Sequence, residues 1–159
     1  MKAITIWQPW ASLLACGGKQ YETRSWATSY RGPIAIHAAK KSMFGALRLI
    51  PIPISDVMKM ALRSEWENLP TGAVIATANL IGCHEIGRID EIEADWEIPC
   101  VPQKTGCWDC NRPGTWIDAT KQEVMFGDWT PGRFAWEFSD MKMITPIPVS
   151  GRQGLWEWK

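Results

Sequence analysis

Three charged residues, Lys19, Glu22 and Arg24, occur within six positions near the start of the chain, directly after Gly17 and Gly18. Glycine lets the backbone approach a ligand closely. A lysine ammonium and an arginine guanidinium both suit a phosphate or a developing oxyanion, and the guanidinium can also read a base edge. The spacing predicts a site in which Lys19, Glu22 and Arg24 contact the ligand and act as the catalytic residues if the protein is an enzyme.

Two roles are open for Lys19. Repulsion by Arg24 together with burial would favour the neutral amine, which could act as a base or nucleophile. The nearby carboxylate of Glu22 would instead hold the ammonium charged, as an electrostatic clamp, and we favour this second role. The alternative without function is a cluster of surface ion pairs that contributes little to stability.

Neighbouring residues could extend the site. Arg31 and Lys40 would add positive charge, and an aromatic ring such as that of Trp10 or Tyr21 could stack on a base for about 1–3 kcal/mol. His37 could act as a general base, although a histidine on a strand is more often a hydrogen-bonded structural residue. The predicted ligand-binding residues are Trp10, Gly17, Tyr21, Arg31, His37 and Lys40.

The charge distribution places an anionic ligand near the amino-terminal third. The net charge is zero, which argues against binding nucleic acid mainly through bulk electrostatics. Residues 1–48, however, hold seven Lys and Arg against one acidic residue, whereas the remainder holds ten against sixteen. The local field of the first third should therefore attract the anion, unless the asymmetry is only that of a solvated surface.

Two cysteines, Cys107 and Cys110, have the spacing of a zinc knuckle, and Cys100 lies upstream. No second Cys-x-x-Cys pair completes four ligands, although Cys83 and His84 could do so from a distant strand end. We expect no metal or cofactor, and keep zinc on Cys100, Cys107 and Cys110 as the alternative.

The length of 159 residues fits one domain. The longest mostly apolar run, residues 73–83, is far shorter than the about 20 residues of a membrane span, and the start lacks a secretory pattern. Five cysteines without such a leader indicate reduced thiols. These features predict a cytoplasmic protein without disulfides or membrane contact, and leave its oligomeric state open.

Hydrophobic periodicity predicts the elements that must position the site. Glu22 and Arg24 should share one face of a strand, and a later strand should be half buried, with Ile34 and Ile36 opposite His37. Strands are expected at 3–7, 20–25, 33–38, 72–83, 134–138 and 142–149, a helix at 9–16, and helical pieces within 41–66 whose core stripe is Val57, Met60, Ala61 and Trp66.

Periodicity is lost between residues 87 and 128, where an acidic run is followed by prolines and cysteines. A stretch of this length is more than an ordinary connection and predicts an insertion, either a lid or a flap. Because short strands outnumber helices, the fold class is expected to be α+β, built on a small mixed or antiparallel barrel with short helices packed on it.

The chain resembles the ASCH family, the activating signal cointegrator homology domains, which belong with the PUA-like folds. The resemblance covers the chain except for about residues 87–128. It is carried by Gln8-Pro9-Trp10-Ala11, by Gly17, Lys19, Glu22, Arg24, Ser25 and Trp26, by Tyr30, Arg31, Gly32, Ile36, His37, Ala38 and Lys40, and by the segments 72–83, 134–136 and 151–156.

The resemblance implies a single PUA-like domain over residues 1–159 with a cleft between barrel and first helix. The Gly-x-Lys-x-x-Glu-x-Arg residues would line this cleft, which would take RNA, a nucleotide or a modified nucleoside. Some relatives are similar to amidohydrolases acting on N4-acetylcytidine, and others to nucleases. Glu22 stands where the acetylcytidine-hydrolysing relatives have threonine.

Three functions therefore follow. The first is a module that binds RNA or a nucleotide through Lys19, Arg24 and Arg31. The alternative is a hydrolase, an amidohydrolase of an N-acylated nucleoside in the same cleft, with Lys19 or Glu22 as acid or base and Arg24 on the oxyanion. The third is a protein-interaction adaptor that uses the acidic insertion.

Overall fold

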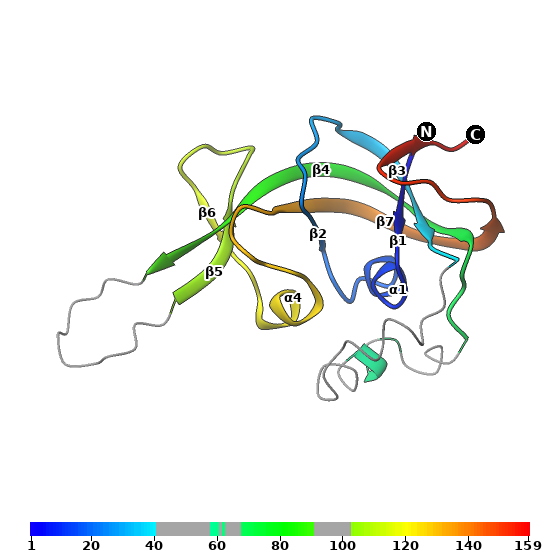
Figure 1. Cartoon of the computed structure of the whole chain (residues 1–159), viewed down its shortest axis with the longest axis horizontal. Coiled ribbons are helices and arrows are strands. Elements are labelled where there is room, and N and C mark those ends of the chain that lie inside the picture. Colours follow the sequence, from blue (N-terminus) through cyan, green and yellow to red (C-terminus); the bar gives the residue numbers. More distant parts are fainter. Residues whose placement is uncertain (41–57, 61, 63–67, 91–102) are drawn as a thin grey trace. The chain divides into compact units, whose positions relative to one another are not determined.

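The structure, a computed structural model, describes residues 1–40, 58–60, 62, 68–90 and 103–159 (Figure 1). They form a mixed sheet whose strands lie in the order β2 (Tyr21–Arg24), β7 (Phe134–Pro148), β4 (Ala73–Asp90), β3 (Gly32–Ala38), β1 (Lys2–Ile6) and β8 (Leu155–Glu157). β5 (Gln103–Trp108) pairs with β4 and with β6 (Trp116–Asp118), and the described helices are short. Two compact units divide the chain: unit 1 holds residues 1–20, 30–81 and 138–159, and unit 2 holds 21–29 and 82–137. The predicted α+β class with a mixed sheet is confirmed.

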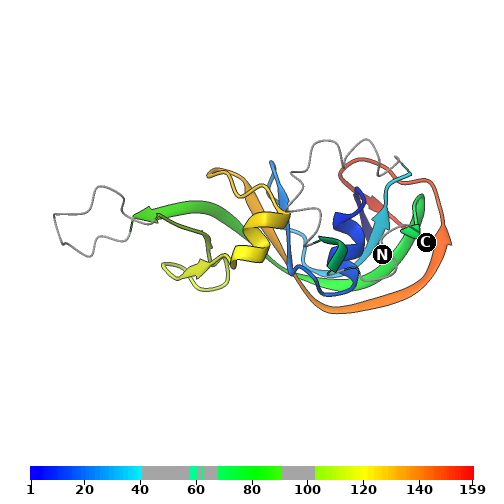
Figure 2. The same ribbon diagram turned by 90° about the horizontal axis from the view of Figure 1, so that it is seen from below.

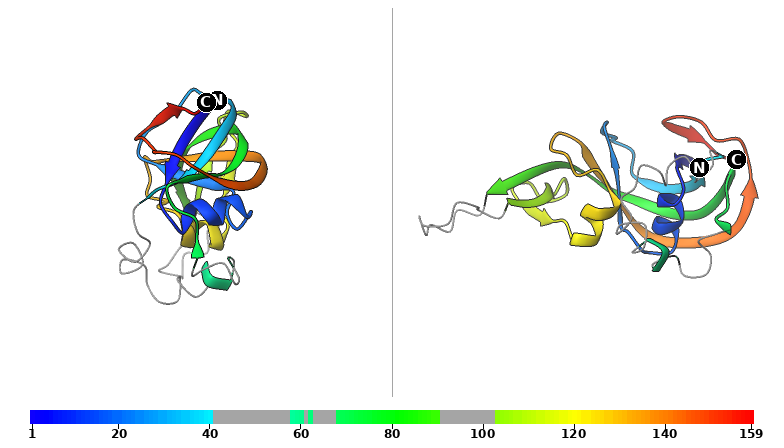
Figure 3. Two further views of the ribbon diagram at one scale, coloured as in Figure 1. Left: turned by 90° about the vertical axis from the view of Figure 1, so that its right-hand side faces the viewer. Right: turned by 60° about the horizontal axis from the view of Figure 1, so that its bottom comes forward.

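Unit 1 contains both ends of the chain. β1 (Lys2–Ile6) pairs in parallel with β3 (Gly32–Ala38) and antiparallel with β8 (Leu155–Glu157). The amino terminus donates to the carbonyl of Trp158 (2.7 Å), so the two termini lie side by side (Figure 3). Ile144 and Val149 pack on a core cluster from β1, β3, β4 and β8.

Helix α1 (Trp10–Ala15) packs against β3 in unit 1 (Figure 2). Gln8 fixes its first turn, since its side-chain oxygen accepts from the amide of Ser12 (3.1 Å) and its side-chain nitrogen donates to the Ser12 hydroxyl (2.8 Å). The helix ends at Ala15, and Gly17, two residues further on, has a left-handed φ of 77°, which favours glycine. The amide of Lys19 then donates back to Leu13 O (3.2 Å), which orders the start of the charged motif.

Unit 2 is built on β2 (Tyr21–Arg24), β5 (Gln103–Trp108), β6 (Trp116–Asp118) and α4 (Lys121–Phe126). It also takes residues 82–90 of β4 (Ala73–Asp90) and 134–137 of β7 (Phe134–Pro148). β2 runs antiparallel to β7, and a small apolar core forms between the strands. Its buried members are Tyr21, Ile86, Cys107, Trp129 and Ala135.

The described part of residues 87–128, where the sequence shows no periodicity, is regular: it supplies the end of β4, then β5, β6 and α4. The pattern is hidden in the sequence because Gly87 and Gly106, which weaken a strand signal, lie beneath the ring of Trp116. A Cβ on Gly106 would lie 2.9 Å from that ring. The lid or flap role and the single-domain expectation stay predictions.

Two expectations about strands need correction. β3 is not half buried: residues 34–38 are all buried, because other parts of unit 1 cover both of its faces. The strands expected at 134–138 and 142–149 form one strand, β7, in which Asp140 adopts a left-handed φ of 51°. A bend at one residue changes the alternation of the sequence without ending the strand.

The expected core stripe within residues 41–66 is wrong at Met60, which is 79% exposed, whereas Met58 and Leu62 are buried. Val57, Ala61 and Trp66 lie outside the described residues, as does most of that segment. The other predicted elements, at 3–7, 9–16, 20–25 and 72–83, are confirmed within one or two residues, except that the last continues to Asp90. None of the described helices is long and apolar enough to cross a membrane.

Candidate functional site

Lys19 is the charged motif residue that lies in unit 1. It follows the left-handed Gly17 at the end of α1, and it is only 4% exposed. Lysine is almost never buried to this extent unless its charge is paired. Gly17 is exposed and Trp10, at the start of α1, is partly buried. The burial of Lys19 contradicts the alternative of a surface cluster for this residue.

Glu22 and Arg24 lie on β2 in unit 2, on one face of the strand as predicted. Their side chains form an ion pair of 3.3 Å, with 11% of the Glu22 side chain and 25% of the Arg24 side chain exposed. Pairing with β7, where Glu22 lies opposite Trp136, fixes the backbone beneath them. A largely buried carboxylate therefore orients a guanidinium that still reaches solvent.

The remaining basic candidates, Arg31 and Lys40, are exposed residues of unit 1. The guanidinium of Arg31 donates to the carbonyl of Tyr30 (2.8 Å). Tyr21, on β2, is instead buried in the core of unit 2, with its ring edge-on to Trp129 at 5.8 Å. Stacking of Tyr21 on a ligand stays a prediction, like the roles of the other site residues.

His37 is buried within unit 1. Its Nε2 lies 3.0 Å from Val149 O, which makes Nε2 the protonated nitrogen, and its ring meets Trp156 edge-on. Gly151 covers the other side, because a Cβ there would lie 2.5 Å from Nδ1. These contacts are typical of a structural histidine, and a ligand-binding role stays a prediction.

Burial holds the pKa of His37 below its usual value, with the bond to Val149 opposing the shift. Below about pH 6.5 the unfolded chain therefore binds a proton that the folded chain does not. We expect stability to fall as the pH drops from about 6.5 towards the folded pKa, by at most about 1.4 kcal/mol per pH unit. Urea unfolding at several pH values should show that His37→Gln lacks this part of the dependence of unfolding free energy on pH. Stability profiles of the variant and the wild type that run parallel would contradict the expectation.

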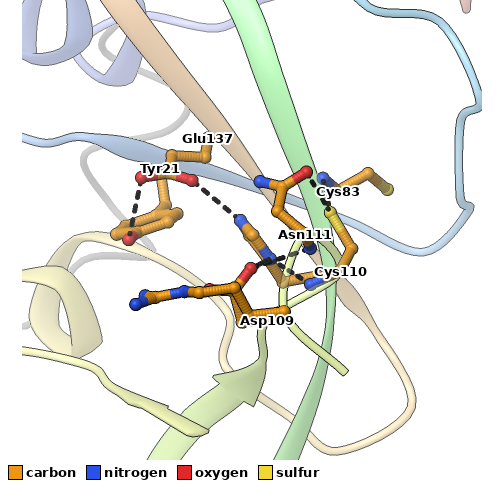
Figure 4. Close-up of polar contacts among 8 residues, drawn as sticks. Tyr21, Cys83, Asp109, Cys110, Asn111 and Glu137 are labelled. Carbon is orange, nitrogen blue, oxygen red and sulfur yellow. Dashed lines mark hydrogen bonds and ion pairs between the residues drawn. The ribbon is translucent and has the colours of Figure 1, made fainter. Parts of the chain in front are cut away.

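A second polar cluster, in unit 2, joins β2, β4, β7 and the turn after β5 (Figure 4). His84 on β4 is completely buried, and its Nε2 lies 2.9 Å from Glu137 Oε2 on β7. The other oxygen of Glu137 accepts from the hydroxyl of Tyr21 (3.5 Å). Burial first, and then Glu137, raise the pKa of Tyr21 above its usual value, so this hydroxyl stays a donor.

The turn after β5 completes this cluster. The amide of Cys110 donates to His84 Nδ1 (3.0 Å), and the amide of Cys83 donates to the sulfur of Cys110 (3.3 Å). Asp109 accepts from Arg112 Nε (2.8 Å) and from the amide of Asn111 (2.8 Å). The bond from Arg112 is the main cause that lowers the pKa of Asp109 below its usual value.

Sequence reasoning finds part of this cluster and misses the rest. Cys83, His84 and Cys110 are conceivable zinc ligands by residue type, whereas Asp109 and Glu137 carry no signal, because only the fold brings β7 and the turn to His84. Cys107 is buried in the apolar core, and burial first, with Glu137 and Asp109, raises the pKa of its thiol to about 12. A protonated thiol is a poor metal ligand. Cys100 lies outside the described residues.

The fold and the motif define a class of protein. The family model of the ASCH domain matches residues 4–148, and the chain belongs to this family. The resemblance stated from the motif residues is therefore confirmed, and with it the PUA-like fold that the family implies.

Two relatives illustrate the similarity. The chain is 26% identical over 160 residues to Activating signal cointegrator 1 of Homo sapiens, covering 97% of this chain and 22% of that protein. It thus spans about a fifth of the length of this relative. The crystal structure of a mutant ZmASCH protein from Zymomonas mobilis is 16% identical, with a TM-score of 0.45, over 99% of this chain and 89% of that one.

Proposed function

We propose that this ASCH domain binds single-stranded RNA or a nucleotide through the charged motif of residues 17–24, with Lys19 and Arg24 as the anion-binding groups. The burial of Lys19 is the observation that carries the proposal. An ammonium group is costly to remove from water, and such a charge is commonly retained where it acts on a ligand.

The pair on β2 supports the same role from unit 2. Glu22 holds the guanidinium of Arg24 at 3.3 Å and leaves part of it exposed, so its remaining donors can form a fork with a phosphate or a base edge. Arg31, which is exposed in unit 1, adds a second positive charge for an anionic ligand. The excess of seven basic residues over one acidic residue in positions 1–48 favours an anionic ligand.

Binding of a labelled single-stranded RNA of about 12 nucleotides, followed by fluorescence anisotropy across a salt series, tests the proposal. Arg24→Ala should weaken binding about tenfold, because one charge-assisted hydrogen bond contributes about 1.5–3 kcal/mol. The slope of log affinity against log salt should decrease by about 0.7 for each phosphate that the variant no longer neutralises. Lys19→Met, which keeps the length of the buried side chain, should have a similar effect.

Lys142→Ala is the matched control, since it removes an exposed positive charge outside the motif and should leave the slope near wild type. A salt series without any slope would overturn the proposal. Incubation with N4-acetylcytidine tests the hydrolase alternative. Hydrolysis by the wild type that is lost in Lys19→Met would favour a hydrolase, in which a buried lysine can act as the base or nucleophile.

We also propose a cytoplasmic location, which is supported by cysteines that are expected to be reduced.

A deletion of residues 90–127 would not be a clean test of the adaptor alternative. It would remove β5, β6 and α4, and with them Cys107 from the core of unit 2. Loss of binding after such a deletion would report unfolding as readily as the removal of a surface.

A further inference from the structure

We propose that His84, Asp109 and Cys110 form a binding site for one zinc-class divalent metal ion in unit 2, independent of the RNA-binding motif. Their ligand atoms all lie within 4.8 Å of one another, and His84 Nδ1 and Asp109 Oδ1 are 3.8 Å apart. With metal–ligand bonds of about 2.0–2.3 Å, tetrahedral ligands are separated by about 3.5 Å. The site therefore needs only a small contraction.

Glu137 prepares the imidazole of His84 for this role. Because Nε2 donates its hydrogen to Glu137 Oε2 at 2.9 Å, the lone pair lies on Nδ1, which is the nitrogen that faces Asp109 and the turn. A carboxylate behind a histidine fixes the ring and its tautomer in metal sites. The same bond holds this histidine, which is completely buried, in a single orientation.

The two other ligands are also held from behind. Arg112 binds Asp109 through Oδ2, so that Oδ1 is the oxygen nearer to His84, and Oδ1 keeps a lone pair beyond the one used by the amide of Asn111. The sulfur of Cys110 accepts an amide hydrogen from Cys83 and lies 3.6 Å from the Asn111 side-chain oxygen. Cys110 is exposed, whereas His84 and Asp109 are buried, which gives an ion one entry side.

One hydrogen bond must be replaced when the ion binds. The amide of Cys110 donates to His84 Nδ1 at 3.0 Å, so this amide must turn away and the metal–nitrogen bond takes its place. The thiol of Cys110 gives its proton to solvent as the metal–sulfur bond forms. Three protein ligands leave the fourth position to water, and the sulfur, nitrogen and oxygen set suits zinc or cobalt rather than calcium or magnesium.

This ligand set differs from the one expected from Cys-x-x-Cys spacing. Cys107 points into the apolar core, while Cys110, three residues on, faces His84 across the turn. Metal binding at this point would link the turn after β5 to β4. The backbone amides of these two segments already donate to each other's side chains, from Cys83 to the Cys110 sulfur and from Cys110 to His84 Nδ1.

Titration of the full chain with Co²⁺ tests the site, because a cysteine ligand gives a thiolate-to-cobalt charge-transfer absorption. We expect one Co²⁺ per chain, and displacement by Zn²⁺. Cys110→Ala should abolish the band, and Cys16→Ala, which removes the exposed cysteine of unit 1, should retain it. Glu137→Gln should lower the affinity at least about tenfold, as for partners behind a metal-bound histidine.

Circular dichroism of each variant separates misfolding from loss of a ligand, and a rise in the melting temperature with Zn²⁺ should occur for wild type and not for Cys110→Ala. A wild-type titration without the charge-transfer band would overturn the site. So would a band that survives in Cys110→Ala, or one that disappears in Cys16→Ala. The RNA-binding test uses other residues, so its failure would leave this site standing.

Discussion

Gly106→Ala is expected to lower the free energy of unfolding by about 2–3 kcal/mol, because an added methyl group has no room between β5 and β6. The new Cβ would lie 2.1 Å from the carbonyl oxygen of Ile117 and 2.9 Å from the ring of Trp116. The first of these neighbours is backbone in a paired strand, which cannot turn aside as a flexible side chain can. Urea unfolding followed by circular dichroism measures the loss.

Gly114→Ala is the matched control for this substitution. Gly114 has a left-handed φ of 78° and nothing within 4 Å of its added Cβ, so it tests backbone strain without a steric clash. We expect a loss of about 1 kcal/mol there. A loss for Gly106→Ala no larger than that for Gly114→Ala would mean that the packing of Ile117 and Trp116 against Gly106 yields to the added methyl group, and would contradict the expectation.

Glu137→Ala is expected to lower the free energy of unfolding by about 2–3 kcal/mol, since it removes an acceptor used by two donors. The Nε2–H of His84, with no exposure to solvent, would lose its partner at 2.9 Å, and the hydroxyl of Tyr21 would lose its acceptor at 3.5 Å. A buried donor without an acceptor costs more than the bond itself contributes. Equilibrium urea unfolding at neutral pH measures the change.

Glu137→Gln provides the comparison, because the amide keeps an oxygen that can accept from His84. We expect it to lose about 1 kcal/mol, less than half the cost of the alanine variant. If both variants are as stable as wild type, the bond between His84 and Glu137 contributes nothing to folding, and the preparation of His84 for a metal ion loses its basis.

Local patterns are sufficient where a segment determines its own structure. Pro9 and the double glycine predict α1 and its end, and alternation predicts β2 with Glu22 and Arg24 on the same face. The family motif lies in these segments, which is why it can be recognised from residue types and spacing alone. Composition also shows where positive charge is concentrated.

Long-range packing decides the remainder. Two long strands, β4 and β7, are expected from the sequence as shorter ones, because a bend at Asp140 and the glycine at position 87 interrupt alternation without breaking hydrogen bonding. The burial of Met58 in place of Met60 likewise depends on which side of a short segment meets the rest of unit 1.

The amino-acid sequence determined the family, the fold class and the charged motif, because these depend on residue type and on spacing within a few turns or strands. Only the tertiary structure decided that Lys19 is buried and that the ring of Trp116 packs on Gly87 and Gly106. It alone also brings Glu137 and Asp109 next to His84. The contact between His84 and Glu137 joins residues that are 53 positions apart. Periodicity within one segment carries no information about which distant segment lies against it.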